Sequence, residues 1–381
     1  MQAPAPSRRL VLVGGGHAHV QVLRRLVMQP DPTVHVTVVT DRARAIYSGM
    51  IPGLVAGQYA EHEVTIDVVP LARRAGAAVV LAPALRIDPQ AKEVVVAGPR
   101  PPVRYDVCSI DIGSTVSGDQ LPGVREHAVP TRPISELDRR IQARLSSLSS
   151  QDDPIRVVVV GAGAAGVELA FALHARVRSM GRMPSVTVVS AALEPQVGGG
   201  TRGARKVRAA FAQLGITHRG GQRVAEVRAR DVCTQDGTVI AADLTVWAGG
   251  AAAHALGRDS GLPVDPDGWI QTTGELSVVG HPDLFAAGDC AVLADGPKVP
   301  RAGVYAVRAG PVLTDNLLAR LTGGRLRSYV PQRHFLALLN TCDGSAIGTR
   351  GAWVGQGRLL GRMKDWIDRR FMEKFQVLDG Q

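Results

Sequence analysis

The sequence predicts an α/β fold built around two separate parallel sheets, and two glycine-rich turns are the main reason. The first turn, Gly14-Gly15-Gly16, follows the strand-like run 9–13, which is apolar from Leu10 on, and the second, Gly161-Ala162-Gly163, follows the apolar run 157–160. Each turn is followed by residues with apolar side chains at helical spacing. A buried strand, a tight glycine turn and a helix form the unit that binds a dinucleotide pyrophosphate at the helix N-terminus. Because the unit occurs twice, we expect two Rossmann-like domains that hold two dinucleotides.

The composition is that of an ordinary globular chain rather than of a nucleic-acid-binding protein. The chain has 381 residues, of which 45% are hydrophobic and 20% are charged, and its formal net charge is +10. Aromatic residues make up only 4%, which leaves few stacking platforms for bases. We therefore expect no nucleic-acid partner, whereas attraction to an anionic membrane surface stays open.

The N-terminal residues do not have the pattern of a signal peptide, and the cysteines are scattered; together these features indicate a reducing compartment. Residues 1–9 contain no apolar stretch of signal-peptide length, and glycines and Glu168 interrupt the apolar segment 157–173. The four cysteines are scattered, without metal-type or dithiol spacing: Cys108, Cys233, Cys290 and Cys342. We expect a cytoplasmic protein, either soluble or bound to the inner face of the cell membrane.

The first glycine-rich turn has the features of a dinucleotide site with one exception. Gly14 allows the tight turn and Gly16 lets the backbone approach a pyrophosphate, but His19 stands where a third glycine is usual. His17 and His19 do not form a good metal pair, because alternate residues of a turn converge poorly on one ion and no third ligand lies near them in the sequence. We expect them to serve local packing or cofactor contact, and we predict no metal site.

Acidic residues at later strand ends complete the first site. The predicted strand 34–39 ends in Thr40-Asp41, and Asp41 is placed to hold a ribose hydroxyl, with Thr40 sharing that task. A strand in 105–112 breaks at Gly113, and a strand near 283–287 ends in Gly288-Asp289. A carboxylate after a glycine at a strand end can accept a hydrogen bond from a polyol chain, which makes Asp289 a candidate.

The second turn carries the complete glycine fingerprint, Gly161, Gly163 and Gly166. Glu168 follows in the first helical turn, where the helix dipole favours a carboxylate; a contact with a nicotinamide amide or a flavin edge is the alternative. The next strand, 185–189, ends in Ser190 without an acidic residue, so a ribose 2′-hydroxyl loses its usual partner. With Arg202 and Arg205 following in the sequence, this pattern favours NADPH or dual use.

The C-terminal part is predicted to contain short strands within 329–351 and then one helix. Apolar residues recur at helical spacing and basic residues decorate the other side. Such a helix either docks on the body or a dimer partner, or lies in a membrane surface. The apolar positions are Leu359, Leu360, Met363, Trp366, Ile367, Phe371, Phe375 and Leu378, and the basic ones are Arg358, Arg362, Lys364, Arg369, Arg370 and Lys374.

Taken in order, these motifs resemble the two-dinucleotide-binding flavoproteins, also called pyridine nucleotide-disulfide oxidoreductases. Within that superfamily the chain is similar to the type II NADH dehydrogenase-like branch, and in particular to the subfamily found alone or fused ahead of selenophosphate synthetase. The resemblance covers nearly the whole chain. It rests on GGGHAHV at 14–20, YSGMIPG at 47–53, DIGS at 111–114, WAGG at 247–250, AGD at 287–289, AGVYAVR at 302–308 and WIDRRFM at 366–372.

The resemblance implies FAD in the first site and NADH or NADPH in the second. It places Gly14, Gly16, Asp41, Gly113 and Asp289 on FAD, and Gly161, Gly163, Gly166 and Glu168 toward NAD(P)H. The other cofactor contacts that we expect are His17, Ala18, Thr40, Ser48, Gly49, Met50, Ala84 and Gly249. It also implies an inserted arrangement: an FAD-binding domain from 1–117 and 251–320, an NAD(P)H-binding domain at 118–250, and a C-terminal segment at 321–381.

These expectations together predict an FAD-dependent NAD(P)H oxidoreductase that passes electrons to an acceptor, with a quinone favoured. No two cysteines are sequence neighbours, so we expect no redox-active disulfide. Glu168 and Tyr305 are the candidate catalytic residues. Two alternatives stay open: a soluble reductase of a selenium or sulfur compound or of a protein partner, and a non-catalytic flavin redox sensor. A homodimer is also left open.

Overall fold

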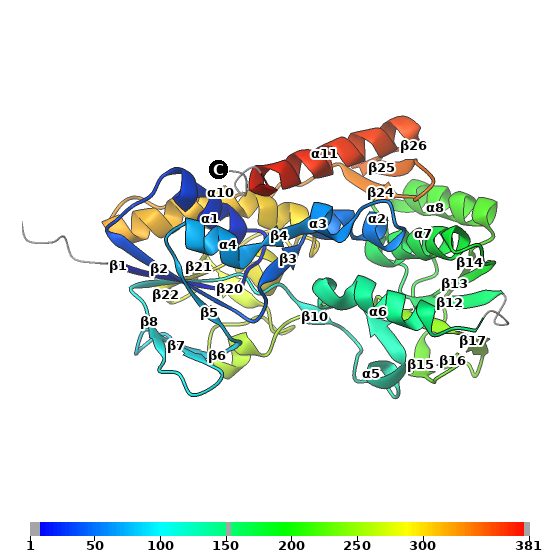
Figure 1. The fold of residues 1–381 in the computed structure, drawn as a ribbon, viewed down its shortest axis with the longest axis horizontal. Coiled ribbons are helices and arrows are strands. Elements are labelled where there is room, and N and C mark those ends of the chain that lie inside the picture. The colour runs from blue at the N-terminus through cyan, green and yellow to red at the C-terminus, as the bar shows by residue number, and fades with distance from the viewer. Residues whose placement is uncertain (1–7, 150–153, 377–381) are drawn as a thin grey trace, which may run out of the picture.

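The computed structural model describes residues 8–149 and 154–376, which form two lobes bridged by a C-terminal layer (Figure 1). Each lobe is built on its own sheet with parallel strands at its centre. The α/β fold with two Rossmann-like sheets is therefore confirmed. The first sheet is formed by strands that precede and strands that follow the second lobe in the sequence. The segment that forms the second lobe is therefore inserted, along the chain, between the two parts of the first.

The first lobe contains an eight-stranded sheet in the order β23-β20-β21-β22-β9-β1-β2-β5. At its centre β1 pairs in parallel with β2 and β9, and β9 pairs in parallel with β22. The strands are β1 (Arg8–Val13), β2 (Val34–Thr40), β5 (Ala78–Leu81), β9 (Val107–Ile110), β20 (Ile270–Thr272), β21 (Ser277–Val278), β22 (His281–Ala286) and β23 (Ala291–Leu293).

Helix α1 follows the first glycine turn and is amphipathic, with its apolar residues on one face. Val20, Leu23 and Leu26 are buried there, and α1 packs against α10 and α4. The helices of this lobe are α1 (His19–Met28), η1 (Ser48–Met50), α2 (Ile51–Val55), α3 (Glu61–Val64), α4 (Val68–Arg74), α9 (Leu256–Asp259), η2 (Gly288–Cys290) and α10 (Gly303–Thr322). Its small antiparallel pieces are β3 (Arg44–Ile46) with β4 (Thr65–Asp67), and β6 (Ala84–Asp88) with β7 (Glu93–Val96) and β8 (Val103–Arg104).

The second lobe has an all-parallel sheet in the order β11-β18-β12-β13-β14. Its central strand is almost wholly buried, as expected for a parallel strand covered on both faces. The sheet strands are β11 (Ala128–Pro130), β12 (Ile155–Val160), β13 (Pro184–Ser190), β14 (Thr217–Gly220) and β18 (Leu244–Trp247). The helices are α5 (Val124–His127), α6 (Ile134–Ser146), α7 (Ala164–Ser179) and α8 (Gly200–Leu214). A smaller sheet holds β15 (Val224–Val227), β16 (Asp231–Thr234) and β17 (Val239–Ala241), and β10 (Thr115–Val116) pairs with β19 (Ala251–Ala252) where the chain passes between the lobes.

The C-terminal layer consists of a three-stranded antiparallel sheet and one long helix; the sequence predicted short strands within 329–351 followed by a helix, and the third strand lies just beyond that range. The strands are β24 (Ala337–Asn340), β25 (Ala346–Arg350) and β26 (Trp353–Gly357), and the helix is α11 (Arg358–Gln376). Helix α11 lies over both lobes (Figure 1) and contacts β24 and β25 as well as α3 and β4. Among the described residues no helix is both long and apolar enough to span a bilayer.

The structure differs from the prediction in which side chains of α11 face the body of the protein and which face solvent. Lys364 was predicted on the solvent side, but it is only 8% exposed and faces the body, as does Asp368 at 5%. Conversely, Leu359 and Trp366 are 79% and 58% exposed. The reason is electrostatic, because the body and the helix itself supply oxygen partners that compensate the burial of the ammonium group. Leu378, predicted on the apolar side, lies outside the described residues.

The buried ion pair on α11 generates a stability prediction. Lys364 Nζ donates hydrogen bonds to Asp368 Oδ2 at 2.8 Å and to the Gly49 carbonyl oxygen at 2.6 Å. Asp368→Asn keeps the shape but leaves the ammonium group without its charged partner, so we expect a loss of about 3 kcal/mol. The check is the apparent melting temperature at a fixed scan rate. Glu373→Gln, at an exposed position of the same helix, is the control; equal melting temperatures for the two variants would contradict the prediction.

Candidate functional site

The first glycine turn is shaped by the end of strand β9. Gly14 has φ +94°, and a Cβ on it would lie 2.3 Å from the carbonyl oxygen of Asp111. A Cβ on Gly16 would lie 2.2 Å from the carboxylate of Asp111. Only glycine fits at either position, so the backbone of the turn is packed directly on the neighbouring strand.

His19 packs beneath this turn, where the fingerprint usually has glycine. The residue is fully buried, with Nδ1 2.8 Å from the Gly14 carbonyl oxygen and Nε2 2.8 Å from Ser109 Oγ. Burial lowers the pKa of His19 to about 4, so the ring is neutral. Its two ring nitrogens tie the turn to β9. Within the described ranges, no three His, Cys, Asp or Glu side chains lie close enough to hold a metal ion.

His17 points instead into an aromatic group. Its ring centroid lies 5.6 Å from that of Tyr47 and 6.4 Å from that of Phe371 on α11, and those two rings are 4.5 Å apart. Nε2 of His17 is buried and has no hydrogen-bond partner in the described structure. A buried polar atom without a partner fits a site that a polar group of a ligand completes.

At the end of β2, Asp41 rather than Thr40 has a side chain that is open to a ligand. The Thr40 hydroxyl donates to the carbonyl oxygen of Arg42 and is buried. The Asp41 side chain is 46% exposed and lies 3.2 Å from Arg42 Nη2, so its carboxylate remains accessible to a ligand. Ala18 is buried at the start of α1, Ala84 lies half-buried on β6, and Gly113 has φ +70° with nothing close to its Cβ position.

Asp289, which the sequence predicted to bind a polyol chain, has a partner that sequence reasoning missed. Asp289 Oδ2 accepts a hydrogen bond from Arg132 Nη2 at 3.1 Å, and both side chains are largely buried. Arg132 lies between β11 and α6, so this ion pair links the second lobe to the Gly-Asp turn of the first. Nothing in the sequence signals the pair, because the two residues are far apart along the chain.

Ser48, Gly49 and Met50 form η1, which faces the start of α10. A Cβ on Gly303 would lie 2.9 Å from Ser48 Oγ, and Met50 is buried. The Gly49 carbonyl oxygen accepts the hydrogen bond from Lys364. The region between the glycine turn, η1 and Asp289 therefore fits FAD, with glycine backbone at the phosphate end and buried polar and aromatic groups at the other.

The glycines of the second turn have two different roles. Gly161 has φ +110°, and its Cβ would lie 2.2 Å from the Ala248 carbonyl oxygen; the Cβ of Gly166 would lie 2.0 Å from the Gly161 carbonyl oxygen. No atom lies within 4 Å of a Cβ on Gly163. The protein itself thus requires glycine at 161 and 166. The open space at Gly163, before the N-terminus of α7, fits a pyrophosphate.

At the end of β13 a serine and a histidine stand in place of an acidic residue. Ser190 Oγ donates to the Ala192 carbonyl oxygen at 2.8 Å and lies 3.0 Å from His218 Nε2. In the segment that follows, Glu194 pairs with Arg208 at 3.1 Å. Gly249 lies at the other side of the turn, where a Cβ would collide with the Ser117 carbonyl oxygen.

Glu168 contacts the C-terminal layer, a role that neither of its two sequence interpretations included. Its Oε1 accepts the backbone N–H of Asn340 at 2.7 Å. Burial raises the pKa of Glu168 to about 7, opposed by the charge of Lys364 and the Asn340 N–H. We refer to Glu168, Lys364, Asp368 and the Gly49 carbonyl as the junction cluster. This cluster was not predicted from the sequence; the i, i+4 spacing of Lys364 and Asp368 is the one local pattern that points to part of it.

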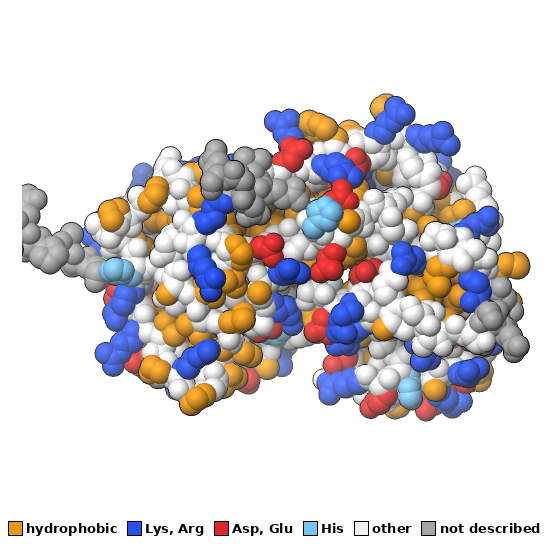
Figure 2. All heavy atoms as spheres, in the orientation of Figure 1, with side chains coloured by type: hydrophobic (Ala, Val, Ile, Leu, Met, Phe, Trp, Pro, Cys, Tyr) orange, Lys and Arg blue, Asp and Glu red, His pale blue; other side chains and the backbone are white. Residues whose placement is uncertain are grey.

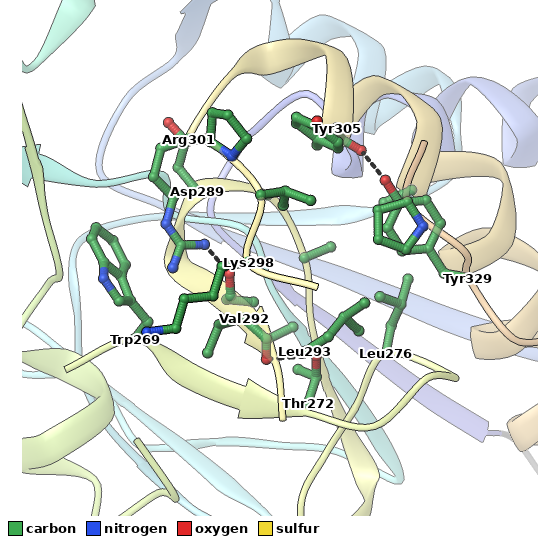
Figure 3. A pocket seen from close by; sticks show the side chains of 18 of the residues that line it. Trp269, Thr272, Leu276, Asp289, Val292, Leu293, Lys298, Arg301, Tyr305 and Tyr329 are labelled. Carbon is green, nitrogen blue, oxygen red and sulfur yellow. Dashed lines mark hydrogen bonds between the residues drawn. The ribbon is translucent and has the colours of Figure 1, made fainter. Parts of the chain in front are cut away.

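Tyr305 belongs to a different part of the molecule. It lines a cavity of about 160 Å³ together with Asp289, Arg301 and Trp269, with the guanidinium of Arg301 4.1 Å above the Trp269 ring (Figure 3). The Tyr305 hydroxyl donates to the Gln332 carbonyl oxygen at 3.4 Å. The structure therefore does not bring Tyr305 into the junction cluster with Glu168.

The cysteines form no dithiol. All four are free, and burial raises the pKa of the Cys290 thiol to about 12 and also raises that of Cys342. Cys290 Sγ donates to the Ala287 carbonyl oxygen, and Cys342 Sγ lies 3.8 Å from the Pro52 carbonyl oxygen. Protonated, buried thiols are poor nucleophiles.

Known proteins share this architecture. Demethylphylloquinone reductase NdbB of Synechocystis is 26% identical over 376 residues, covering 95% of this chain and 92% of that protein. Type II NADH:quinone oxidoreductase Ndh of Mycobacterium tuberculosis is 24% identical, covering 87% and 77%. The structure of NDH2 from Plasmodium falciparum with NADH matches with a TM-score of 0.80 over 97% of both chains, at 13% identity. Residues 8–310 match the pyridine nucleotide-disulphide oxidoreductases, and the chain belongs to that family.

Proposed function

We propose that this protein is an FAD-dependent NAD(P)H:quinone oxidoreductase that works without a redox-active disulfide. The observation that carries the proposal is the convergence of both lobes on the junction cluster, where Lys364 of α11 donates to the Gly49 carbonyl oxygen of η1 and faces Glu168 of α7. The relatives named as quinone reductases support the acceptor. We assign FAD to 1–117 and 251–320, NAD(P)H to the inserted 118–250, and a covering role to 321–381.

The residues of the chain bind, orient and shield, while FAD when bound supplies the transfer of a hydride's two electrons to an acceptor. Gly16 and Gly163 give two pyrophosphates close access to helix N-termini. Asp41 holds a ribose, and Asp289, fixed by Arg132, holds the polyol chain. The aromatic side chains of Tyr47 and Phe371 cover the ring end and exclude water.

Glu168 is the proton-holding group of this arrangement. A quinone takes up protons along with electrons, and a carboxyl with a pKa near 7 is well matched to donate one at neutral pH. The Asn340 N–H fixes the orientation of the carboxyl, and Lys364 faces it with a positive charge that keeps the deprotonated form tolerable. Tyr305 lines the cavity near Asp289, apart from Glu168. We propose that any role of Tyr305 toward the acceptor is played from the wall of that cavity.

The exposed side of α11 suits a membrane surface, where quinones dissolve. Leu359, Trp366 and Ile367 are exposed, and basic residues lie among them along the upper edge of the molecule (Figure 2). Apolar side chains flanked by arginines are typical of a helix that lies in the plane of an anionic bilayer. The enzyme would then be peripheral on the inner membrane face; a dimer contact through the same stripe is the competing arrangement.

The central experiment is an anaerobic titration of the purified protein. NADH or NADPH is expected to bleach the flavin band, and a short-chain quinone to restore it. Recovery with selenium or sulfur oxidants alone would favour the soluble reductase related to the selenophosphate synthetase-linked subfamily. Absence of bleaching by either nucleotide would leave only a redox sensor and overturn the enzyme proposal.

Glu168→Gln tests the proton donor. In the wild type we expect quinone reduction to fall as pH rises above about 7, because the carboxyl then loses its proton. The variant cannot donate, so its rate should be about 100-fold lower and flat across that range. Stopped-flow kinetics separate the steps: reduction by NADH should be nearly unchanged. A wild-type pH profile retained in the variant would contradict the assignment.

Gly163→Ala and Gly161→Val test the second turn as a pair. Alanine at 163 meets nothing in the protein, so the melting temperature should not change while nucleotide affinity falls about tenfold, equivalent to about 1.4 kcal/mol. Valine at 161 collides with Ala248 and should abolish reduction by NAD(P)H with FAD still bound. Calorimetric titration with NADH measures the first effect. Unchanged nucleotide affinity in Gly163→Ala would contradict the placement of the pyrophosphate.

The double substitution of Trp366 and Ile367 by serine tests membrane docking. Each exposed apolar side chain contributes about 1.5–3 kcal/mol on burial, so co-sedimentation with phosphatidylglycerol vesicles should fall at least tenfold. Leu193→Ser, at a 78% exposed position of the second lobe, is the control. If vesicle binding persists and the protein instead changes from dimer to monomer in solution, the stripe is a subunit contact.

A further inference from the structure

Asp111 is a buried carboxylate directly after β9, and the proposed function gives it no task. It is 2% exposed, and its Oδ2 accepts the backbone N–H groups of Ala18 and His19 at 2.8 and 3.0 Å. A Cβ on Gly16 would lie 2.2 Å from Oδ1, and one on Gly288 would lie 2.6 Å from it. The carboxylate thus fills the space between the two glycine turns that line the proposed FAD site.

Its position places it against the phosphates of the cofactor. The N-terminus of α1 is the natural seat of a dinucleotide pyrophosphate because its N–H groups and dipole attract anions. Asp111 already occupies two of those N–H groups. Oδ1 has no hydrogen bond in the described structure and lies between Gly16, at the pyrophosphate, and Gly288, next to the polyol-binding Asp289. A negative charge at this point would repel bound FAD.

Among the residues that the structure describes, no free cation faces Asp111 to offset that repulsion. Burial lowers the pKa of both His17 and His19, and burial raises the pKa of the Cys290 thiol, so all three are neutral near pH 7. Asp289 is a second negative group and is paired with Arg132. On the far side of η2, Arg301 stacks on Trp269 and donates to the Ala291 carbonyl oxygen.

We propose that FAD binding favours the protonated form of Asp111, so that up to one proton is taken up from solvent when FAD binds to the protein with a deprotonated Asp111. The neutral carboxyl keeps its two backbone hydrogen bonds through Oδ2 and can donate its own O–H from Oδ1 toward the cofactor. No covalent bond changes; at most one solvent proton is transferred to the carboxylate on binding and returned on release. The inference rests on FAD occupying the first site.

The direction of the pH effect follows from where the proton is bound. Burial raises the pKa of Asp111 to about 6 in the protein without cofactor, against the opposing hydrogen bonds and His17. Nearby phosphate charge raises it further in the complex. FAD affinity should therefore be constant below pH 6 and fall by up to tenfold per pH unit above it, until the pKa of the complex is reached.

The test measures FAD binding to the FAD-depleted full chain by flavin fluorescence between pH 5.5 and 8.5. It also uses calorimetry in two buffers of different protonation enthalpy, which counts the protons taken up. We expect net uptake at pH 7.5 in the wild type and at least fivefold weaker binding at pH 8 than at pH 6.5. Asp111→Asn should show no uptake and a flat affinity. Asp106→Asn, whose carboxylate precedes the same strand and pairs with Arg9 on the surface, should behave as the wild type.

Each outcome has one meaning. A wild-type protein that binds FAD with no proton uptake overturns the inference, as does an Asp111→Asn variant that keeps the wild-type slope. If Asp111→Asn does not fold, the proton count of the wild type decides alone. A chain that binds no FAD at any pH overturns the proposed function instead, and the two failures are therefore distinguishable.

Discussion

The buried ammonium group of Lys364 is the charge around which the parts of this protein are arranged. It bonds to the Gly49 carbonyl of the first lobe and to Asp368 of its own helix, and it faces Glu168 of the second lobe. Removing an ammonium ion from water is costly, and these oxygens compensate only in the observed geometry. Helix α11 is thereby held where the lobes meet. The same ammonium group thus relates η1 of the first lobe to Glu168 of the second.

The two glycine turns look alike in sequence but are built differently. The second is closed by backbone: Gly161 fits against Ala248, and Gly166 against Gly161 itself. In the first, Gly14 also fits against backbone, but two side chains take part as well: Asp111 accepts N–H groups at the start of α1, and His19 hydrogen-bonds the Gly14 carbonyl oxygen. Side chains that titrate or hydrogen-bond can adapt the first site to its ligand, whereas the second turn has backbone contacts alone at these glycines. This asymmetry suits a cofactor held through many turnovers in one site and a substrate that comes and goes in the other.

Near the proposed cofactors, the groups placed to gain and lose protons around neutral pH are buried carboxyls and not thiols. The thiols of Cys290 and Cys342 are kept protonated by their apolar surroundings. Two carboxyls, those of Glu168 and Asp111, have pKa values raised by the same desolvation. A site of this kind can hold and release protons near neutral pH while electrons pass without any covalent intermediate on the protein.

The sequence by itself determined the fold class, the two glycine turns and their strands, because these features are local. A valine run and the glycine that follows it can be recognised within ten residues, and the structure shows Gly14 and Gly161 at positive φ. The sequence also indicated the short C-terminal strands and the helix after them. Only the tertiary structure decided that Lys364 faces inward, that Asp289 is held by Arg132, and that Glu168 meets Asn340. Each of these contacts joins residues more than 150 positions apart or turns a helix against its apparent polarity. Periodicity records which residues share a face, but which face is buried depends on partners that folding brings from elsewhere in the chain.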